Sequence, residues 1–160
     1  MKETNKPVVV AVSGGFDPIH AGHVRMFHDA KKLGDELVVI INNDNWLYKK
    51  KGYIFMNERE RKEIIKSIKY VDHVVITNHP PDPTDMSVTK ELRELNPDVF
   101  ANGGDRVKKN TPEVTLCQKM GIKMAFNVGH GGKIQSSSEL VQTAMKKAPQ
   151  KITVKIRGKK

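Results

Sequence analysis

Short apolar runs alternate with amphipathic segments along the first part of the chain. Pro7–Val12 and Glu36–Ile41 are almost continuously apolar and β-branched, which predicts strands that are buried on both faces. Between them, apolar residues recur at helical spacing from Gly22 to about Leu33, and Gly34 follows as a stop signal. The pattern therefore predicts a strand, a helix and a second strand in that order.

The same alternation continues to about residue 147. Asn57, with Glu60 three residues later, has the pattern of a capping box and predicts a helix start. The segment Asn42–Tyr53 is polar and rich in lysine, and it is predicted to be a functional loop. Further strands are predicted at Asp72–Thr77, Pro97–Ala101 and Ile122–Val128, and further helices at Asn57–Tyr70, Ser87–Leu95, Pro112–Met120 and Ser136–Lys147.

This order of elements predicts one fold class. Strands that are separated by helices form right-handed crossovers and a parallel sheet. We therefore expect an α/β fold, a doubly wound Rossmann-like sheet of five parallel strands with helices on both faces. Ile152, Val154 and Ile156 alternate with polar residues, which predicts an additional C-terminal edge strand.

Composition narrows the class of protein. The 160 residues fit a single domain. Cys117 is the one cysteine, which excludes an intrachain disulfide and a CxxC zinc site and favours a reduced, cytoplasmic protein. No apolar run approaches the ~20 residues that span a bilayer. Met1–Lys6 also lacks the apolar stretch of a signal peptide.

The net charge of +10 raises the alternative of a nucleic-acid-binding module. Residues 146–160 hold seven cations and no acid, so residues 1–145 carry only +3. Aromatic residues are 6% of the chain and scattered, whereas single-strand binding uses aromatic stacking platforms. We therefore expect a domain of residues 1–147 and a basic tail of residues 148–160. The tail is either a solvated segment or a cationic arm for anions, and nucleic acid is not the expected partner.

Ligands of such sheets bind outside the carboxyl ends of the strands. Four predicted loops leave those ends, and each is rich in Gly, Asn, His, Lys or Ser. A basic, glycine-bearing rim of this kind indicates a polyphosphate site. The loops are Ser13–His23, Asn42–Tyr53, Ala101–Lys109 and Gly129–Ser138.

The first of these loops carries the clearest chemical pattern. His20 and His23 stand three residues apart at a predicted helix N-terminus, with Gly22 between them. Free N–H groups and the helix dipole at such a terminus bind phosphate, and imidazoles can donate hydrogen bonds to phosphoryl oxygens. Alone, the pair also fits surface or metal-linked histidines. No third ligand at close spacing supports zinc, and no metal-binding residue is predicted.

The string Gly14–His23 resembles the G-x-F-D-x-x-H-x-G-H motif of the HxGH nucleotidyltransferase superfamily, which includes cytidylyltransferases and adenylyltransferases. The likeness extends over about residues 8–145 and is nearest to heptose-phosphate adenylyltransferase and glycerol-phosphate cytidylyltransferase domains. The serines lack the preceding arginine of the glycerol-phosphate branch, and the base stays open between ATP and CTP. Three later segments also match: Asn57–Arg61 with Tyr70–Asp72, Asn102–Asp105, and Ile134–Ser138.

The resemblance implies an in-line displacement in which a phosphate of a sugar or polyol attacks the α-phosphorus of a nucleoside triphosphate and releases pyrophosphate. His20 and His23, with Lys49 or Lys51, would stabilise the phosphoryl charge. Asp17 would hold the loop rather than act as a base. The other residues implied are, for the nucleotide, Gly14, Gly15, Phe16, Asp17, Gly22, Gly103, Gly104, Asp105, Ser136, Ser137 and Ser138, and, for phosphate or acceptor, Arg61, Arg59 and Lys133.

The resemblance also implies a cofactor and an assembly. Mg²⁺ would arrive with the triphosphate and keep several waters, so it needs few protein ligands. A homodimer is the implied state. Two alternatives stay open, a nucleic-acid-binding module that uses the basic tail and a non-catalytic nucleotide-binding protein with the same fold.

Overall fold

A computed structural model describes residues 5–131 and 133–148; the edge strand predicted at residues 152–156 lies outside this range. Five parallel strands form one sheet in the order β3-β2-β1-β4-β5. This confirms the predicted Rossmann-like α/β class. The strands are β1 (Val9–Gly14), β2 (Glu36–Ile41), β3 (His73–Ile76), β4 (Val99–Ala101) and β5 (Lys123–Ala125).

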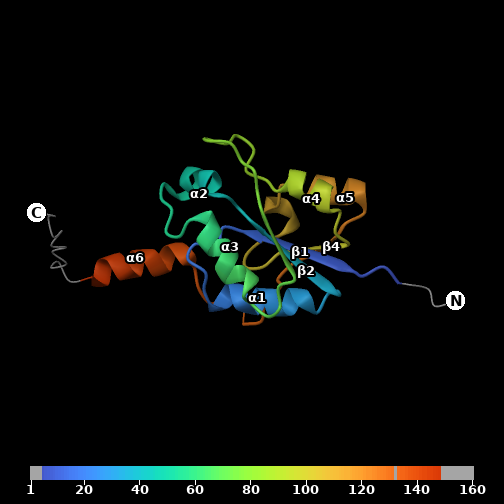
Figure 1. Ribbon diagram of the computed structural model, residues 1–160, viewed down its shortest axis with the longest axis horizontal. Helices are drawn as coiled ribbons and strands as arrows, with labels where there is room; N and C mark the ends of the chain where they lie inside the picture. The colour runs from blue at the N-terminus through green and yellow to red at the C-terminus, as the bar shows by residue number, and fades with distance from the viewer. Residues whose placement is uncertain (1–4, 132, 149–160) are drawn as a thin grey trace, which may run out of the picture.

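Helices connect the strands and cover both faces of the sheet (Figure 1). They are α1 (Ala21–Lys31), α2 (Asp44–Lys51), α3 (Glu58–Lys66), α4 (Thr89–Leu95), the short 3₁₀ helix η1 (Lys108–Asn110), α5 (Val114–Met120) and α6 (Ser137–Lys147). None of the helices in the described part of the chain has the length and apolar character needed to cross a membrane.

The core divides into two layers, one on each face of the sheet. On one face, Phe27 of α1 and Ile65 of α3 pack against apolar side chains of β1 and β2. On the other face, Leu92 of α4 and Cys117 of α5 pack around Phe100 of β4. All five side chains are fully buried. The central strands therefore show the continuous apolar runs that the sequence pattern detects, because both of their faces are covered.

The prediction of a loop at Asn42–Tyr53 is wrong, because this segment contains helix α2. The Asn43 side chain caps this helix by accepting a hydrogen bond from the Trp46 N–H, and Gly52, with φ of 78°, ends it. Leu47 is the fully buried side chain of the helix. With few apolar positions and three consecutive lysines, α2 has no clear helical periodicity in the sequence.

Other predicted boundaries move by a few residues. The Asn57 side chain accepts a hydrogen bond from the Glu60 N–H, as the capping pattern predicts, but α3 ends at Lys66 instead of continuing to Tyr70. Helix α5 starts at Val114 rather than at Pro112. These shifts do not alter the order of elements.

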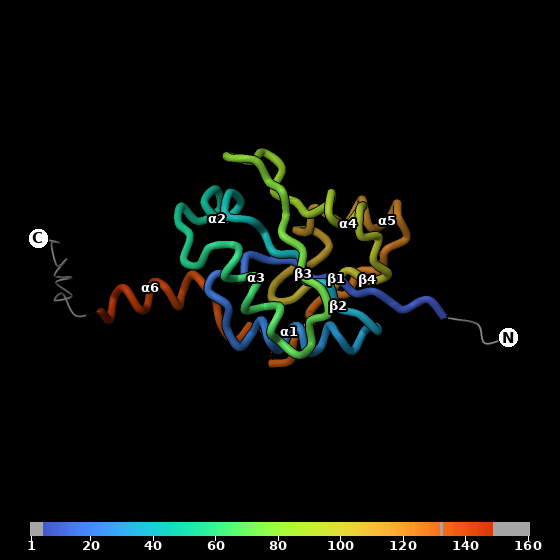
Figure 2. The backbone as a smooth tube through the Cα atoms, in the orientation of Figure 1, coloured from blue at the N-terminus to red at the C-terminus, as the bar shows by residue number. Residues whose placement is uncertain are grey.

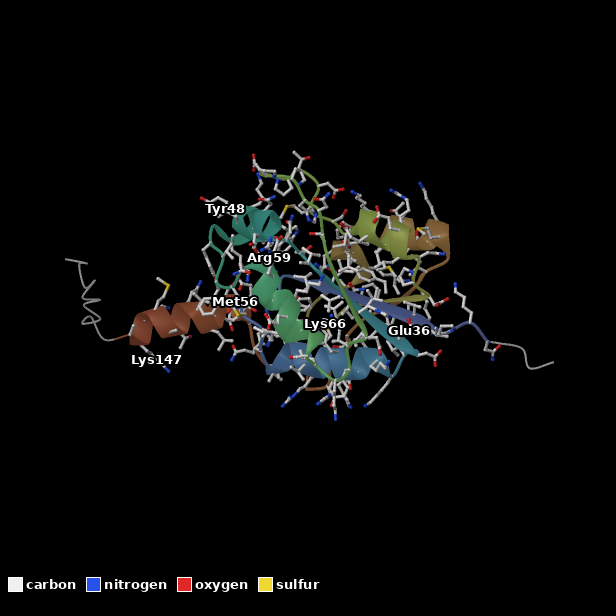
Figure 3. The ribbon with its side chains drawn as sticks, in the orientation of Figure 1. Glu36, Tyr48, Met56, Arg59, Lys66 and Lys147 are labelled. Atoms are coloured by element: carbon white, nitrogen blue, oxygen red, sulfur yellow. The ribbon has the colours of Figure 1, made fainter. Side chains whose placement is uncertain are left out.

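The carboxyl ends of the strands mark one end of the molecule. Glu36, at the start of β2, lies at the opposite end of the sheet from Tyr48 and Met56 (Figure 3). Helix α6 begins at the carboxyl end and projects away from the body, as the tube in Figure 2 shows. It contributes no fully buried side chain.

Candidate active site

The loops after β1, β2, β4 and β5 meet around one cavity of about 300 Å³. The strand order places the switch point between β1 and β4, where such sheets bind ligands. The cavity is lined by Ser13, Gly14, Gly15, Phe16, His20, Gly22, His23, Met26, Asn42, Trp46, Asn102, Gly103, Gly104, Arg106, Val128, Gly129, His130, Lys133, Ile134, Gln135, Ser136 and Ser137.

His20 and His23 form the N-terminal cap of α1 between them. The Nδ1 atom of His20 accepts a hydrogen bond from the Gly22 N–H over 3.1 Å, and the Nδ1 atom of His23 accepts one from the His20 N–H over 3.2 Å. The two rings stack with their centroids 3.7 Å apart and their planes at 23°. Capping thus fixes both imidazoles at the helix end that is favourable for anions.

These hydrogen bonds also fix the tautomer of each ring. Because both Nδ1 atoms act as acceptors, the proton of each neutral imidazole lies on Nε2. Burial and the positive charge of Lys51 lower the pKa of His20, and burial, His20 and Lys51 lower the pKa of His23 to about 3. Near neutral pH the free protein therefore presents two uncharged Nε2–H donors.

The ring of Phe16 packs against the ring of His23. Phe16 is buried and adopts a φ of 52°, which turns the chain sharply after β1. Its ring meets His23 edge-on, with centroids 5.0 Å apart and planes at 89°. A Cβ atom on Gly14 would lie 2.9 Å from the Phe16 ring, so a side chain there would displace the ring. Gly14 and Phe16 both line the cavity, and Phe16 also packs against the His23 ring.

Asp17 is completely buried and holds a second loop against the first. Its two carboxylate oxygens accept hydrogen bonds from the backbone N–H groups of Phe55 and Met56, each over 2.7 Å. This geometry supports the expectation that Asp17 orders the loop.

The lysines Lys49 and Lys51 of α2 have different surroundings. Lys51 is half-buried and donates to the Asp17 carbonyl oxygen over 2.9 Å, and burial lowers its pKa. Its positive charge also lowers the pKa of both histidines, although Lys51 is not among the residues that line the cavity. Lys49 instead pairs with Asp82 beside a separate cavity. Lys51, but not Lys49, therefore contacts the loop that carries the histidine pair.

Arg61 was expected to contact phosphate or acceptor, but its side chain is buried and bonds to other parts of the chain. Its Nε donates to the Met56 carbonyl oxygen, Nη1 donates to the carbonyl oxygens of Gly15 and Asn42, and Nη2 pairs with Asp44, all over 2.7–3.0 Å. The side chain is 1% exposed. Arg61 thus joins the loops after β1 and β2 to α3, and this use of its donors argues against a direct ligand contact.

Arg59 is also not brought to the site. It is exposed on α3 (Figure 3) and lines a different cavity with Asn78 and His79. Lys133, the third residue expected at the phosphate or acceptor, lines the cavity that holds the histidines.

The loop after β4 forms part of the cavity wall. A Cβ atom on Gly103 would lie 2.7 Å from Met26 Sδ and 2.9 Å from the Val128 carbonyl oxygen, so only glycine allows this close approach. Gly104 has a φ of 65°, a conformation that favours glycine. Both line the cavity, whereas Asp105 is exposed and not part of the lining.

The start of α6 closes the remaining side. Ser136 caps the helix, its Oγ accepting from the Glu139 N–H over 3.5 Å. The Ser137 hydroxyl donates to the Pro18 carbonyl oxygen over 2.7 Å, which ties α6 to the histidine loop. Ser136 and Ser137 line the cavity, and Ser138 does not.

Several lining residues were missed by the sequence reasoning. Asn42 and Asn102 follow directly after β2 and β4, a position that the rule for parallel sheets makes a candidate. The Oδ1 atom of Asn42 is buried without a hydrogen-bond partner among the described residues. Trp46 and Arg106 lie in two of the segments expected at the carboxyl ends of the strands, Asn42–Tyr53 and Ala101–Lys109, but their residue types did not single them out.

A switch-point cavity with paired imidazoles at a helix N-terminus defines a nucleotide-binding α/β domain with phosphoryl-transfer chemistry. The model of the cytidylyltransferase-like family matches residues 11–156. The chain belongs to this family and is a nucleotidyltransferase.

Curated relatives share the sequence across much of the chain. An FAD synthase from Pyrococcus horikoshii is 43% identical over 104 residues, which are 64% of this chain and 67% of that protein. An FAD synthase from Methanobrevibacter smithii is 33% identical over 143 residues, which are 86% of this chain and 90% of that protein.

A solved structure has the same fold. The crystal structure of the lipopolysaccharide core biosynthesis protein from Thermoplasma volcanium GSS1 superposes with a TM-score of 0.63 and 27% sequence identity. The match covers 78% of this chain and 99% of that protein.

Proposed function

We propose that this nucleotidyltransferase transfers AMP from ATP to FMN and releases pyrophosphate, forming FAD. The observation that carries the acceptor and the base is the similarity to FAD synthases, which in one case extends over 86% of this chain. FMN carries its phosphate on a ribityl chain, so it falls within the class of polyol phosphates that the sequence motif implies.

The chemistry needs little beyond positioning and charge stabilisation. An oxygen of the FMN phosphate forms a bond to the α-phosphorus of ATP, and the bond between that phosphorus and the pyrophosphate oxygen breaks. A phosphate monoester is largely ionised at neutral pH, because its second pKa is about 6. No general base is required, which agrees with the structural use of Asp17.

The histidine pair supplies the donors for the developing charge. The two Nε2–H groups belong to residues that line the cavity, and their partners on Nδ1 hold the rings in place. Lys51 adds a positive charge beside them. Donors that are fixed before the reaction stabilise the transition state without reorganisation.

Mg²⁺ is the proposed cofactor, and the donors of the cavity fit an ion that arrives with the triphosphate. Among the described residues, the lining includes no carboxylate. Asn42, which lines the cavity and whose Oδ1 has no hydrogen-bond partner among the described residues, would be the residue to hold the ion or one of its waters. When bound, the ion would neutralise triphosphate charge. Chelation with EDTA should therefore abolish turnover, and added Mg²⁺ should restore it.

The test is a matrix of ATP and CTP against FMN and other phosphorylated acceptors, with chromatography of FAD and an assay of pyrophosphate. ATP with FMN should give FAD and pyrophosphate in equal amounts. Pyrophosphate release with a sugar phosphate, but no FAD from ATP and FMN, would overturn the acceptor while leaving nucleotidyl transfer intact. For variants of the cavity histidines, His73→Asn is the matched control, because His73 is exposed and does not line the cavity.

A further inference from the structure

The described part of the chain holds one group of three potential metal ligands that includes neither His20 nor His23. It consists of His28 and Asp29 near the end of α1 and His130 in the loop between β5 and α6. We propose that these three side chains bind a divalent transition-metal ion and thereby fasten this loop to α1.

The donors already converge without an ion. His28 Nδ1 lies 2.9 Å from one carboxylate oxygen of Asp29, and His130 Nδ1 lies 3.0 Å from the other. One ligand atom from each residue lies within 4.8 Å of the other two. A metal ion bound by the two Nδ1 atoms and the carboxylate, with the proton of each neutral imidazole on Nε2, would need only small movements of these groups.

Two contacts further restrict the positions of the three side chains that would ligate the metal. The His28 ring meets Tyr70 edge-on, with centroids 4.8 Å apart. The backbone N–H of His130 donates to Asp29 over 2.7 Å, so the loop is held in register with the carboxylate. Lys32 approaches Asp29 at 3.4 Å, but its side chain is 64% exposed and can turn into solvent.

The donor set indicates which ions fit. Two imidazoles and one carboxylate suit Zn²⁺, Co²⁺ or Ni²⁺, whereas Mg²⁺ prefers an all-oxygen shell. Three protein ligands leave a fourth position to water. The site is therefore chemically distinct from that of the Mg²⁺ proposed to accompany the triphosphate.

The location links the ion to the wall of the cavity. Gly129 and Gly131, on either side of His130, have φ values of 114° and 86°, and a Cβ atom on Gly129 would touch the Met26 backbone. Gly129 and His130 line the cavity with the histidine pair. A bound ion would hold this wall in place.

The experiment is a titration of the metal-free full chain with Co²⁺, followed by visible absorption and calorimetry, without nucleotide or flavin. Wild type should bind one ion at this site, and His130→Ala, at a 57% exposed position, should weaken binding by at least ~10-fold. Asp29→Asn should weaken it similarly. A hundredfold excess of Zn²⁺ over its Kd should raise the wild-type Tm by about 5 °C or more, and that of His130→Ala much less.

Two controls separate this site from other imidazoles. His73→Ala removes an exposed histidine beside Glu36 and should leave Co²⁺ binding unchanged. His20→Asn removes one ring of the stacked pair and should also leave the His130-dependent binding in place. The proposal is overturned if His130→Ala binds Co²⁺ like wild type, or if wild type shows no saturable binding. Because the assay contains no substrate, neither result depends on the FAD synthase proposal.

Discussion

The backbone N–H of His20 donates a hydrogen bond to the Nδ1 atom of His23 over 3.2 Å. With the bond from Gly22 to His20, this makes a reciprocal cap in which each histidine serves the helix through Nδ1. The remaining nitrogen of each ring, Nε2, therefore carries the proton of the neutral form. One local motif thus starts α1 and selects the tautomer that can donate to a phosphoryl oxygen.

Loss of either Nε2–H donor should lower turnover strongly. His20→Asn keeps a side-chain oxygen that can cap the helix but removes the imidazole donor. His23→Gln removes the second. Each should reduce the rate of pyrophosphate release by at least ~10²-fold, the scale of losing one preorganised donor. His73→Asn is the control, and wild-type rates in both cavity variants would contradict the proposed mechanism.

The stability of the protein should depend on pH through His23. Its pKa is about 3 in the folded chain, mainly because of burial, against an ordinary value of 6.5. Below pH 6.5 the unfolded chain takes up a proton that the folded chain refuses, so stability falls as pH falls from 6.5 towards 3. By pH 5, His23 alone should have lowered the free energy of unfolding by ~2 kcal/mol.

Urea unfolding at pH 7, 6 and 5 measures this dependence. Carboxylates that titrate in the same range affect wild type and His23→Gln alike, so the difference between the two isolates the histidine. The variant should lose less stability on acidification. Parallel curves for the two proteins would mean that His23 takes up its proton as easily in the folded chain as in the unfolded one.

Sequence patterns could predict the fold because most elements bury a recognisable face. Strands β1 and β2 are covered on both sides, so their apolar runs are continuous. Helix α2 escaped prediction because it buries little besides Leu47 and carries three lysines. Its cap at Asn43 and its stop at Gly52 are both readable, but without an apolar stripe they did not identify a helix.

The site was predictable where the backbone imposes the geometry. His20, His23 and Gly103 reach the cavity because each lies at a strand or helix terminus. The positions of long side chains were harder to predict, since their direction depends on tertiary contacts. Arg61 turns inward to backbone carbonyls and Lys49 turns outward to Asp82, and spacing along the chain encodes neither choice.

Lys51 and Lys49 should differ sharply in their effect on catalysis. Lys51 contacts the loop that carries the histidine pair, whereas Lys49 pairs with Asp82 at a separate cavity. A hydrogen bond to a charged group is worth ~1.5–3 kcal/mol, so Lys51→Ala should lower kcat/KM by ~10-fold or more. Lys49→Ala removes an equal charge from the same helix and should change it less than twofold. Equal losses would show that only net charge matters.

Arg61→Lys should destabilise the protein despite conserving the charge. The guanidinium donates to three backbone carbonyls and pairs with Asp44 from a fully buried position. A lysine ammonium cannot reproduce the planar fork, so backbone carbonyls that Arg61 now satisfies lose their donor, and each unsatisfied buried group costs ~1–3 kcal/mol. Arg59→Lys, on the exposed side of the same helix, should stay within ~0.5 kcal/mol of wild type. Denaturant midpoints at constant m-value measure both. Equal midpoints for the two variants would show that Arg61 does not join the loops after β1 and β2.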